Sequence, residues 1–194
     1  MTSESKDTQA YSSCAIAVFQ GFPKIARFSR EVVMTEKIDG TNAQVLVLED
    51  GRVLAGSRTR FVTPEDDNHG FAAWVRDHED ELRKGLGPGR HFGEWWGKGI
   101  NRGYGLDERR FSLFNTSRWT QDNQPACCHV VPVLGRTEGF ERELLEEMLT
   151  YLRDGGSVAA PGFMRPEGVV LFHTAGNFCL KRTLEKDDAG KGSG

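Results

Sequence analysis

Residues 35–42 read Thr-Glu-Lys-Ile-Asp-Gly-Thr-Asn and follow the apolar run Val32–Met34. The pattern over residues 32–37 predicts a strand, and in a strand Lys37 and Asp39 project from one face. Gly40 lets the backbone turn close to a ligand, because it has no Cβ. A lysine held beside a carboxylate in a cleft is a candidate nucleophile. A hairpin end with a surface ion pair explains the same residues, so other parts of the chain must decide between them.

Short apolar runs on both sides of this stretch predict a fold rich in hairpins. The runs expected to form strands are 43–49, 52–57, 91–95, 111–114, 130–134, 168–173 and 178–181. Asp50-Gly51 predicts a type I′ turn. Apolar residues at helical spacing predict two amphipathic helices, over residues 71–82 and 140–156. This layout predicts an α+β fold with mainly antiparallel sheets, and the lack of regular strand–helix alternation excludes a doubly wound sheet.

Composition indicates one globular domain. The chain has 194 residues, of which 38% are hydrophobic, and its net charge of −3 excludes a basic coat over the whole surface. It has no apolar run of 18 residues, and its polar start is not a secretory signal, so we expect a cytoplasmic protein without a membrane segment. We expect residues 1–13 and 187–194 to be disordered, and residues 14–186 to form the domain.

The four cysteines form neither a disulfide framework nor a pair of zinc-ligand motifs. Cys127-Cys128-His129 is the nearest approach to a metal site, but a structural zinc site needs four ligands, usually as two spaced pairs. Buried free thiols in a reducing compartment are therefore the better interpretation.

Five more short motifs follow the first in order along the chain. They are Ser57-Arg58-Thr59, Phe-Gly-Glu-Trp-Trp-Gly at 92–97, Phe-Ser-Leu-Phe-Asn at 111–115, Glu-Gly-Val-Val at 167–170, and Leu-Lys-Arg at 180–182. With Lys37-Ile38-Asp39-Gly40, this set resembles motifs I, Ia, III, IIIa, IV and V of the covalent nucleotidyltransferases. It is most similar to the RNA ligase family, especially its short phage and bacterial members, over residues 22–181. The resemblance implies a nucleotidyltransferase (adenylation) domain with antiparallel sheets and flanking helices around an ATP cleft.

The resemblance also implies an activity, which is ATP-dependent RNA ligation. Lys37 would attack the α-phosphate of ATP to give lysyl-AMP and pyrophosphate. AMP would then pass to a 5′-phosphate RNA end, which a 3′-hydroxyl attacks. The other implied roles are phosphate neutralisation and catalysis by Lys181, phosphate contact by Arg58, adenine contact by Glu36, ribose contact by Glu94, adenine stacking by Phe114, and binding of Mg²⁺ by Glu167.

One position departs from the family pattern. RNA ligases usually carry a second lysine two residues after the first in motif V, and here that residue is Thr183. A non-catalytic ATP- or RNA-binding module with a degenerate motif V is therefore one alternative. DNA ligases and GTP-using capping guanylyltransferases, which share Lys-x-Asp-Gly, are others. Few residues follow Lys181, so we expect a weak grip on RNA and consider a partner protein as a source of additional grip.

A basic stretch is the predicted RNA surface. Residues 83–110 contain seven Lys or Arg against three acids, with aromatic residues interleaved. Phosphate contacts dominate affinity for nucleic acids, and aromatic rings stack on unpaired bases. Lys98, Arg102 and Tyr104 are the candidate RNA-facing residues.

Overall fold

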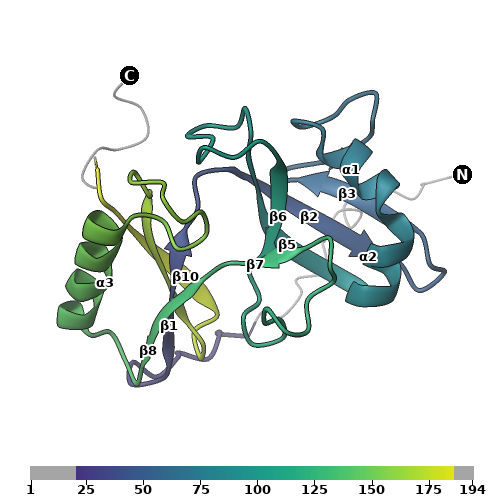
Figure 1. Cartoon of the computed structure of the whole chain (residues 1–194). Helices are drawn as coiled ribbons and strands as arrows, with labels where there is room; N and C mark the ends of the chain where they lie inside the picture. The colour runs from purple at the N-terminus through teal and green to yellow at the C-terminus, as the bar shows by residue number, and fades with distance from the viewer. Residues whose placement is uncertain (1–20, 186–194) are drawn as a thin grey trace, which may run out of the picture.

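The computed structural model describes residues 21–185, which form two packed β-sheets and three helices (Figure 1). The smaller sheet has the strand order β10-β9-β1-β8, and the larger sheet has the order β4-β3-β2-β5-β6-β7. Every named strand pair is antiparallel except β6 with β7. The predicted α+β class with mainly antiparallel sheets is confirmed.

The element bounds follow the apolar runs of the sequence. The smaller sheet contains β1 (Val32–Lys37), β8 (Val133–Thr137), β9 (Gly168–His173) and β10 (Phe178–Thr183). The larger sheet contains β2 (Thr41–Val47), β3 (Val53–Ser57), β4 (Phe61–Val62), β5 (Gly89–Gly97), β6 (Arg109–Leu113) and β7 (His129–Val130). The helices are α1 (Phe71–Asp77), α2 (Glu79–Leu86) and α3 (Arg142–Gly155).

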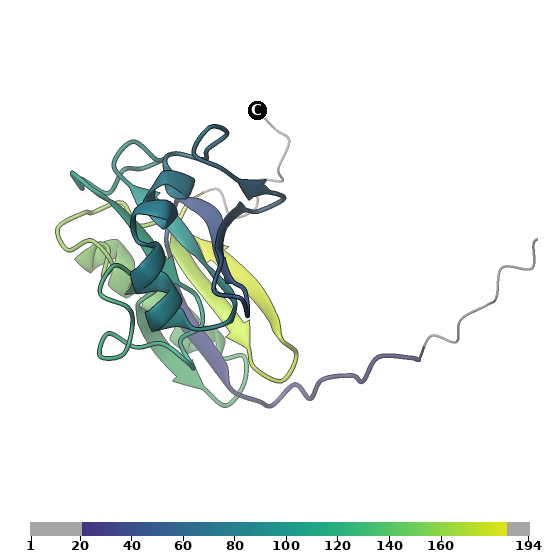
Figure 2. The ribbon, with the colours of Figure 1, turned by 90° about the vertical axis from the view of Figure 1, so that its right-hand side faces the viewer.

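Each sheet buries one face under helices. Strand β2 buries Ala43, Val45 and Val47 against apolar side chains of α1 and α2, and those helices cover the larger sheet in Figure 2. The smaller sheet packs Val32, Met34, Val169 and Leu171 against Leu149 and Leu152 of α3. Because strand residues alternate between faces, Thr35 and Lys37 lie on the face of the smaller sheet that α3 does not cover.

A three-residue connection joins the sheets immediately after Lys37. Residues 38–40 lead from β1 to β2, and Gly40 lies against β5. A Cβ at Gly40 would lie 2.5 Å from the carbonyl oxygen of Trp95 and 2.7 Å from Cβ of Trp96. No real Cβ has such contacts, so only glycine lets this turn approach β5 so closely.

Three local predictions need correction. The predicted strand 130–134 is divided between β7 and β8 in different sheets, because Pro132 has no N–H and its carbonyl accepts a hydrogen bond from Glu36 N–H. The predicted helix 71–82 is two helices that meet at His78. The turn at Asp50-Gly51 is not type I′, since only Gly51 has a positive φ.

The cysteines of the described residues are not paired in disulfides. Cys127 is half-buried, Cys128 is buried and Cys179 is exposed, and all three are free thiols. Within residues 21–185, there is no group of three or more His, Cys, Asp or Glu side chains that could hold a metal. No helix of the described part is long and apolar enough to cross a membrane. Cys14 and both termini predicted to be disordered lie outside the described residues.

The contact of Gly40 with β5 yields a stability prediction. Gly40→Ala should lower the free energy of unfolding by about 1–3 kcal/mol, because the new methyl group collides with backbone that cannot rotate away. Gly155→Ala is the matched control, since nothing lies within 4 Å of its added Cβ. Thermal unfolding of both variants checks this. Equal melting temperatures for the two variants would contradict the steric account.

Candidate active site

Lys37 and Glu167 form an ion pair at the edge of the two sheets. Lys37 is the last residue of β1, and its Nζ lies 2.5 Å from Oε2 of Glu167. The strand register explains the contact, because Lys37 pairs with Gly168, the first residue of β9, and Glu167 precedes it directly. Two residues separated by 130 positions in sequence are thereby brought together.

The register also places Lys181 and Thr183 on the face that carries Lys37. Lys37 pairs with Gly168, which in turn pairs with Thr183 on β10. Lys181 pairs with Val170 two residues away, and residues two apart on a strand share a face. Thr183 is therefore in register with Lys37 across the sheet. Lys181 is exposed on the same face, two residues along β10 from that register position.

Glu94 fixes the turn that follows Lys37. It lies buried on β5, where Oε1 accepts the Gly40 N–H at 3.1 Å and Oε2 accepts the Asn42 amide at 2.9 Å. Burial raises the pKa of Glu94 to about 7, against the lowering effects of the Asn42 hydrogen bond and the nearby Lys37 charge. The charge of Lys37 thus affects the pKa of Glu94, and Glu94 binds the turn at residues 38–40 that follows Lys37.

A loop between β5 and β6 holds Asp39 from the other side. The Asp39 carboxylate accepts hydrogen bonds from Arg102 Nε and Asn101 Nδ2, both at 3.0 Å. The Tyr104 hydroxyl accepts the Asp39 N–H at 2.8 Å. Arg102 also donates to the carbonyl of Arg165 at 3.0 Å, two residues before Glu167. Arg102 therefore links the two chain segments that carry Lys37 and Glu167.

These contacts correct part of the predicted RNA surface. Tyr104 is only 2% exposed, and its ring packs on Trp96 and Phe163 at centroid distances of 4.9 and 4.6 Å. The prediction that Tyr104 faces RNA is wrong, because its ring is part of a small core. Arg102 is half-buried and bound to Asp39, so its place is in the site rather than on a free surface. Lys98 is exposed, as expected.

Glu36 lies on the opposite side of β1 from Lys37. Its carboxylate is buried and accepts hydrogen bonds from Ser157 Oγ at 2.6 Å, Val158 N–H at 2.8 Å and Ala159 N–H at 2.9 Å. Burial raises the pKa of Glu36, and these three hydrogen bonds act against that rise. A direct contact of this carboxylate with a ligand beside Lys37 would require it to leave these partners.

Phe114 and Arg58 lie on the larger sheet. Phe114 directly follows β6 and is 42% exposed, so it is not a core residue. Glu94 pairs with Ser112, and Phe114 lies two residues further on, so Phe114 belongs to the Glu94 face of the sheet. Arg58 is exposed in the turn between β3 and β4. Of the predicted residues, Glu167 therefore contacts Lys37 directly and Glu94 binds the turn after it, whereas Phe114 and Arg58 lie on the other sheet.

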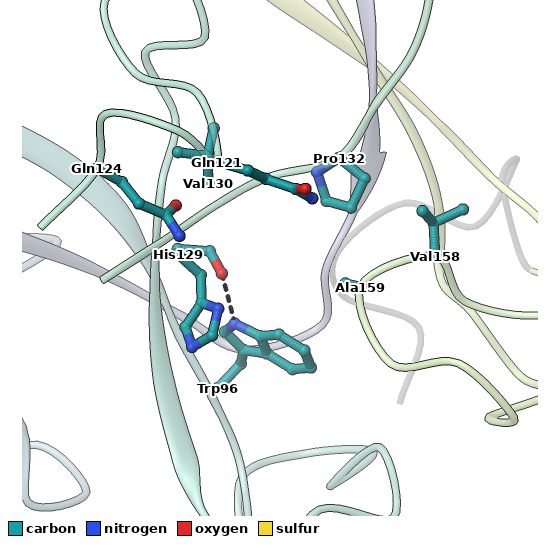
Figure 3. Close-up of a pocket in the computed structure, with 9 residues that line it drawn as sticks. Trp96, Gln121, Gln124, His129, Val130, Pro132, Val158 and Ala159 are labelled. Carbon is teal, nitrogen blue, oxygen red and sulfur yellow. Dashed lines mark hydrogen bonds between the residues drawn. The ribbon is translucent and has the colours of Figure 1, made fainter. Parts of the chain in front are cut away.

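A cavity of about 260 Å³ has a lining that differs from this cluster (Figure 3). Gln121 and Gln124 reach into it from one side, while Val158 and Ala159 lie on the other; Trp96, Ser112, His129, Val130 and Pro132 complete its lining. Oε1 of Gln124 is buried without a hydrogen-bond partner among the described residues. The lining does not include Lys37, Glu94, Phe114 or Glu167, so the cavity is separate from the candidate site. Three of its lining residues bind Glu36: the N–H groups of Val158 and Ala159 donate to its carboxylate, and the Pro132 carbonyl accepts its N–H.

Comparisons with known proteins identify the family and the fold. The model of the RNA ligase family matches residues 30–183. Among solved structures, Naegleria gruberi RNA ligase with PPi is 21% identical, with a TM-score of 0.58 over 80% of this chain and 50% of that chain. A lysine-to-alanine variant of the same ligase with ATP and Mn is 20% identical, with a TM-score of 0.57 over 80% and 49%. The chain thus spans about half the length of these structures. The comparison with curated proteins finds no match.

The raised pKa of Glu94 makes stability depend on pH. The folded protein binds the Glu94 proton up to about pH 7, whereas the ordinary pKa is 4.5, so the free energy of unfolding should fall as pH rises between these values. The full difference corresponds to about 3 kcal/mol. Glu94→Gln should remove this contribution, so its stability relative to wild type should rise with pH over that window.

Urea unfolding at several pH values measures this difference. Glu147→Gln, on the exposed face of α3, is the control and should follow wild type at every pH. A constant difference between Glu94→Gln and wild type from pH 4.5 to 7 would show that the Glu94 pKa is not raised.

Proposed function

The chain belongs to the RNA ligase family, and we propose on that basis that it is an ATP-dependent RNA ligase acting through lysyl-AMP on Lys37. The observation that carries the proposal is the ion pair of Lys37 with Glu167 at 2.5 Å, beside a turn held by Glu94. It supports the proposal because the ion pair and the turn fix the orientation of Lys37, and a nucleophile needs a fixed orientation toward the atom that it attacks. The solved structures with PPi and with ATP and Mn are those of a longer ligase, and they suggest the same substrate class here.

The proposed first step forms one bond and breaks one. Nζ of Lys37 attacks the α-phosphorus of ATP, a nitrogen–phosphorus bond forms, and the bond to the β-phosphate oxygen breaks, so that pyrophosphate leaves with the electron pair. The ammonium group must first lose a proton, which at an ordinary lysine pKa costs about 4.6 kcal/mol at pH 7. Glu167 lies within hydrogen-bond distance of Nζ and is positioned to hold or accept that proton.

The nucleotide is proposed to lie between the two sheets. Phe114 would stack on the adenine from the larger sheet, with Val170 of the smaller sheet opposite. Glu94 would accept a hydrogen bond from a ribose hydroxyl, and Lys181 and Arg58 would neutralise phosphate oxygens. The contact of Glu36 with adenine stays a prediction, and it would require the carboxylate to give up bonds to residues 157–159.

The residues present also fit a divalent cation. Glu167 offers a hard carboxylate oxygen beside Lys37, and phosphate oxygens of the nucleotide would complete the ligands, as Mg²⁺ prefers. We propose Mg²⁺ held by Glu167. When bound, such a cation neutralises negative charge on the phosphates.

Thr183 supports a second candidate function, a nucleotide-binding module that does not join ends. It lies on the row of Lys37 and Gly168, so the departure from the family pattern falls beside the proposed nucleophile. A threonine hydroxyl donates a hydrogen bond but carries no charge, so Lys181 would be the one motif V cation on that face. Joining of a pre-adenylated RNA to a 3′-hydroxyl end separates the two candidates, since only a ligase completes it.

Labelled ATP tests the proposed activity. Wild type incubated with α-labelled ATP and Mg²⁺ should retain the label after denaturation, because the phosphoramidate is covalent. Lys37→Ala should lose all label, whereas Lys84→Ala, an exposed lysine on α2, should keep it. Equal labelling of Lys37→Ala and wild type would exclude Lys37 as the nucleophile.

Loss of the Arg102 side chain, which links Asp39 to the Arg165 carbonyl, should slow the formation of lysyl-AMP. Arg102→Ala removes the link between Asp39 and the Arg165 carbonyl, so Lys37 and Glu167 should lose their fixed separation, and single-turnover adenylation should slow by about 100-fold. Arg76→Ala, an exposed arginine of α1, is the control and should match wild type. If Arg102→Ala adenylates at the wild-type rate but loses RNA binding, the positioning role of Arg102 is wrong and the RNA contact predicted from the sequence is correct.

A further inference from the structure

Residues 22–30 have a regular pattern that neither the sheets nor the candidate site use. They read Phe-Pro-Lys-Ile-Ala-Arg-Phe-Ser-Arg, with apolar side chains at 22, 25 and 28 and cations at 24, 27 and 30. No acidic residue occurs in the segment, so its charge is +3. We call residues 22–30 the basic arm.

The basic arm exposes both sets of side chains. It contains no helix or strand, and in Figure 2 it leaves the domain as an extended stretch. Phe22, Ile25 and Phe28 are 87%, 79% and 69% exposed. Large apolar groups at such exposure, repeated at a fixed interval, are unusual on a surface and indicate an interaction site.

The arm is anchored at one end and forms a basic hollow there. The Phe28 carbonyl lies 3.1 Å from Nε2 of His173, and the Phe28 ring packs on Phe140 at 5.7 Å. A hollow of about 300 Å³ lies between the arm and the β9–β10 turn; it is lined by Lys24, Ile25, Ala26, Arg27, Arg30 and Ala175. Three cations and no carboxylate line this hollow, so it suits a phosphate group.

We propose that the basic arm binds a single-stranded part of the RNA substrate. Cations that contact phosphates, combined with aromatic side chains on which bases stack, are how proteins grip single strands with little sequence preference. The arm supplies both from one segment. This inference takes its substrate class from the proposed function.

The position of the arm defines which part of the RNA it holds. Strand β1 begins at Val32, beside the arm, and ends at Lys37, so the two sites are separated by the length of β1, about 17 Å. The arm therefore binds RNA away from the reacting end. Loss of the arm should weaken RNA binding and joining while leaving the reaction with ATP unchanged.

Salt dependence of RNA binding tests the cations. The full chain is titrated with a fluorescent, short, single-stranded RNA, with and without Lys24→Ala, Arg27→Ala and Arg30→Ala combined. Loss of three phosphate contacts should reduce the slope of log Kd against log salt by about 2. Wild-type affinity should then fall about 20-fold more than that of the variant between about 50 and about 200 mM salt. Arg76→Ala, Arg142→Ala and Arg153→Ala combined remove the same charge from exposed positions elsewhere and should keep the wild-type slope.

A second variant tests the apolar side chains. Phe22→Ala with Ile25→Ala should weaken RNA binding without changing the salt slope, because base stacking on Phe22 and apolar contact with Ile25 do not release counterions. Equal RNA affinity for wild type and both arm variants, or an equal slope change in the control, would overturn the proposal. Binding of wild type to phosphatidylserine vesicles but not to RNA would overturn it too. Labelling with ATP is measured in parallel, so a wild type that binds RNA through the arm but forms no lysyl-AMP would refute the proposed function alone.

Discussion

The turn at residues 38–40 is the constraint on which the rest of the site depends. It joins the two sheets directly after Lys37, and β5 contacts it so closely that only glycine fits at position 40. Glu94 binds its backbone from one side, while Asn101, Arg102 and Tyr104 bind Asp39 from the other. Lys37 is thus held by neighbours that are distant in sequence, which is how a reactive side chain gains a fixed position.

The positive charge of Lys37 lies close to two carboxyl groups, those of Glu167 and Glu94. Glu167 pairs with Lys37 directly, and Glu94 is buried nearby with a pKa raised to about 7. Such buried charges are costly to the fold unless partners or ligands compensate them. We interpret the cost as part of the function, because a phosphate-bearing nucleotide and its cation would change the charge balance around Lys37.

The sequence predicted the fold class and most strands, because apolar alternation is a local signal. Strand β1 and strand β9 were predicted with their observed bounds. The break at Pro132 and the burial of Tyr104 depend on contacts between distant segments, and no local pattern reveals them. The bonds from Arg102 to Asp39 and to the Arg165 carbonyl were not predicted, for the same reason. The available signal was a basic residue in the glycine-rich loop that follows the motif at 92–97. The hydrogen bonds of the Glu36 carboxylate were also not predicted, since its partners at 157–159 lie far along the chain.

Lys37 is the one proposed nucleophile, positioned by the turn after it and by its ion pair with Glu167. Its most direct test is peptide mapping by mass spectrometry of the full chain after reaction with ATP and Mg²⁺. If Lys37 is the nucleophile, AMP should be added to the peptide that contains Lys37 and to no other lysine. An added AMP on Lys181, or an unmodified chain that nevertheless binds ATP, would contradict it.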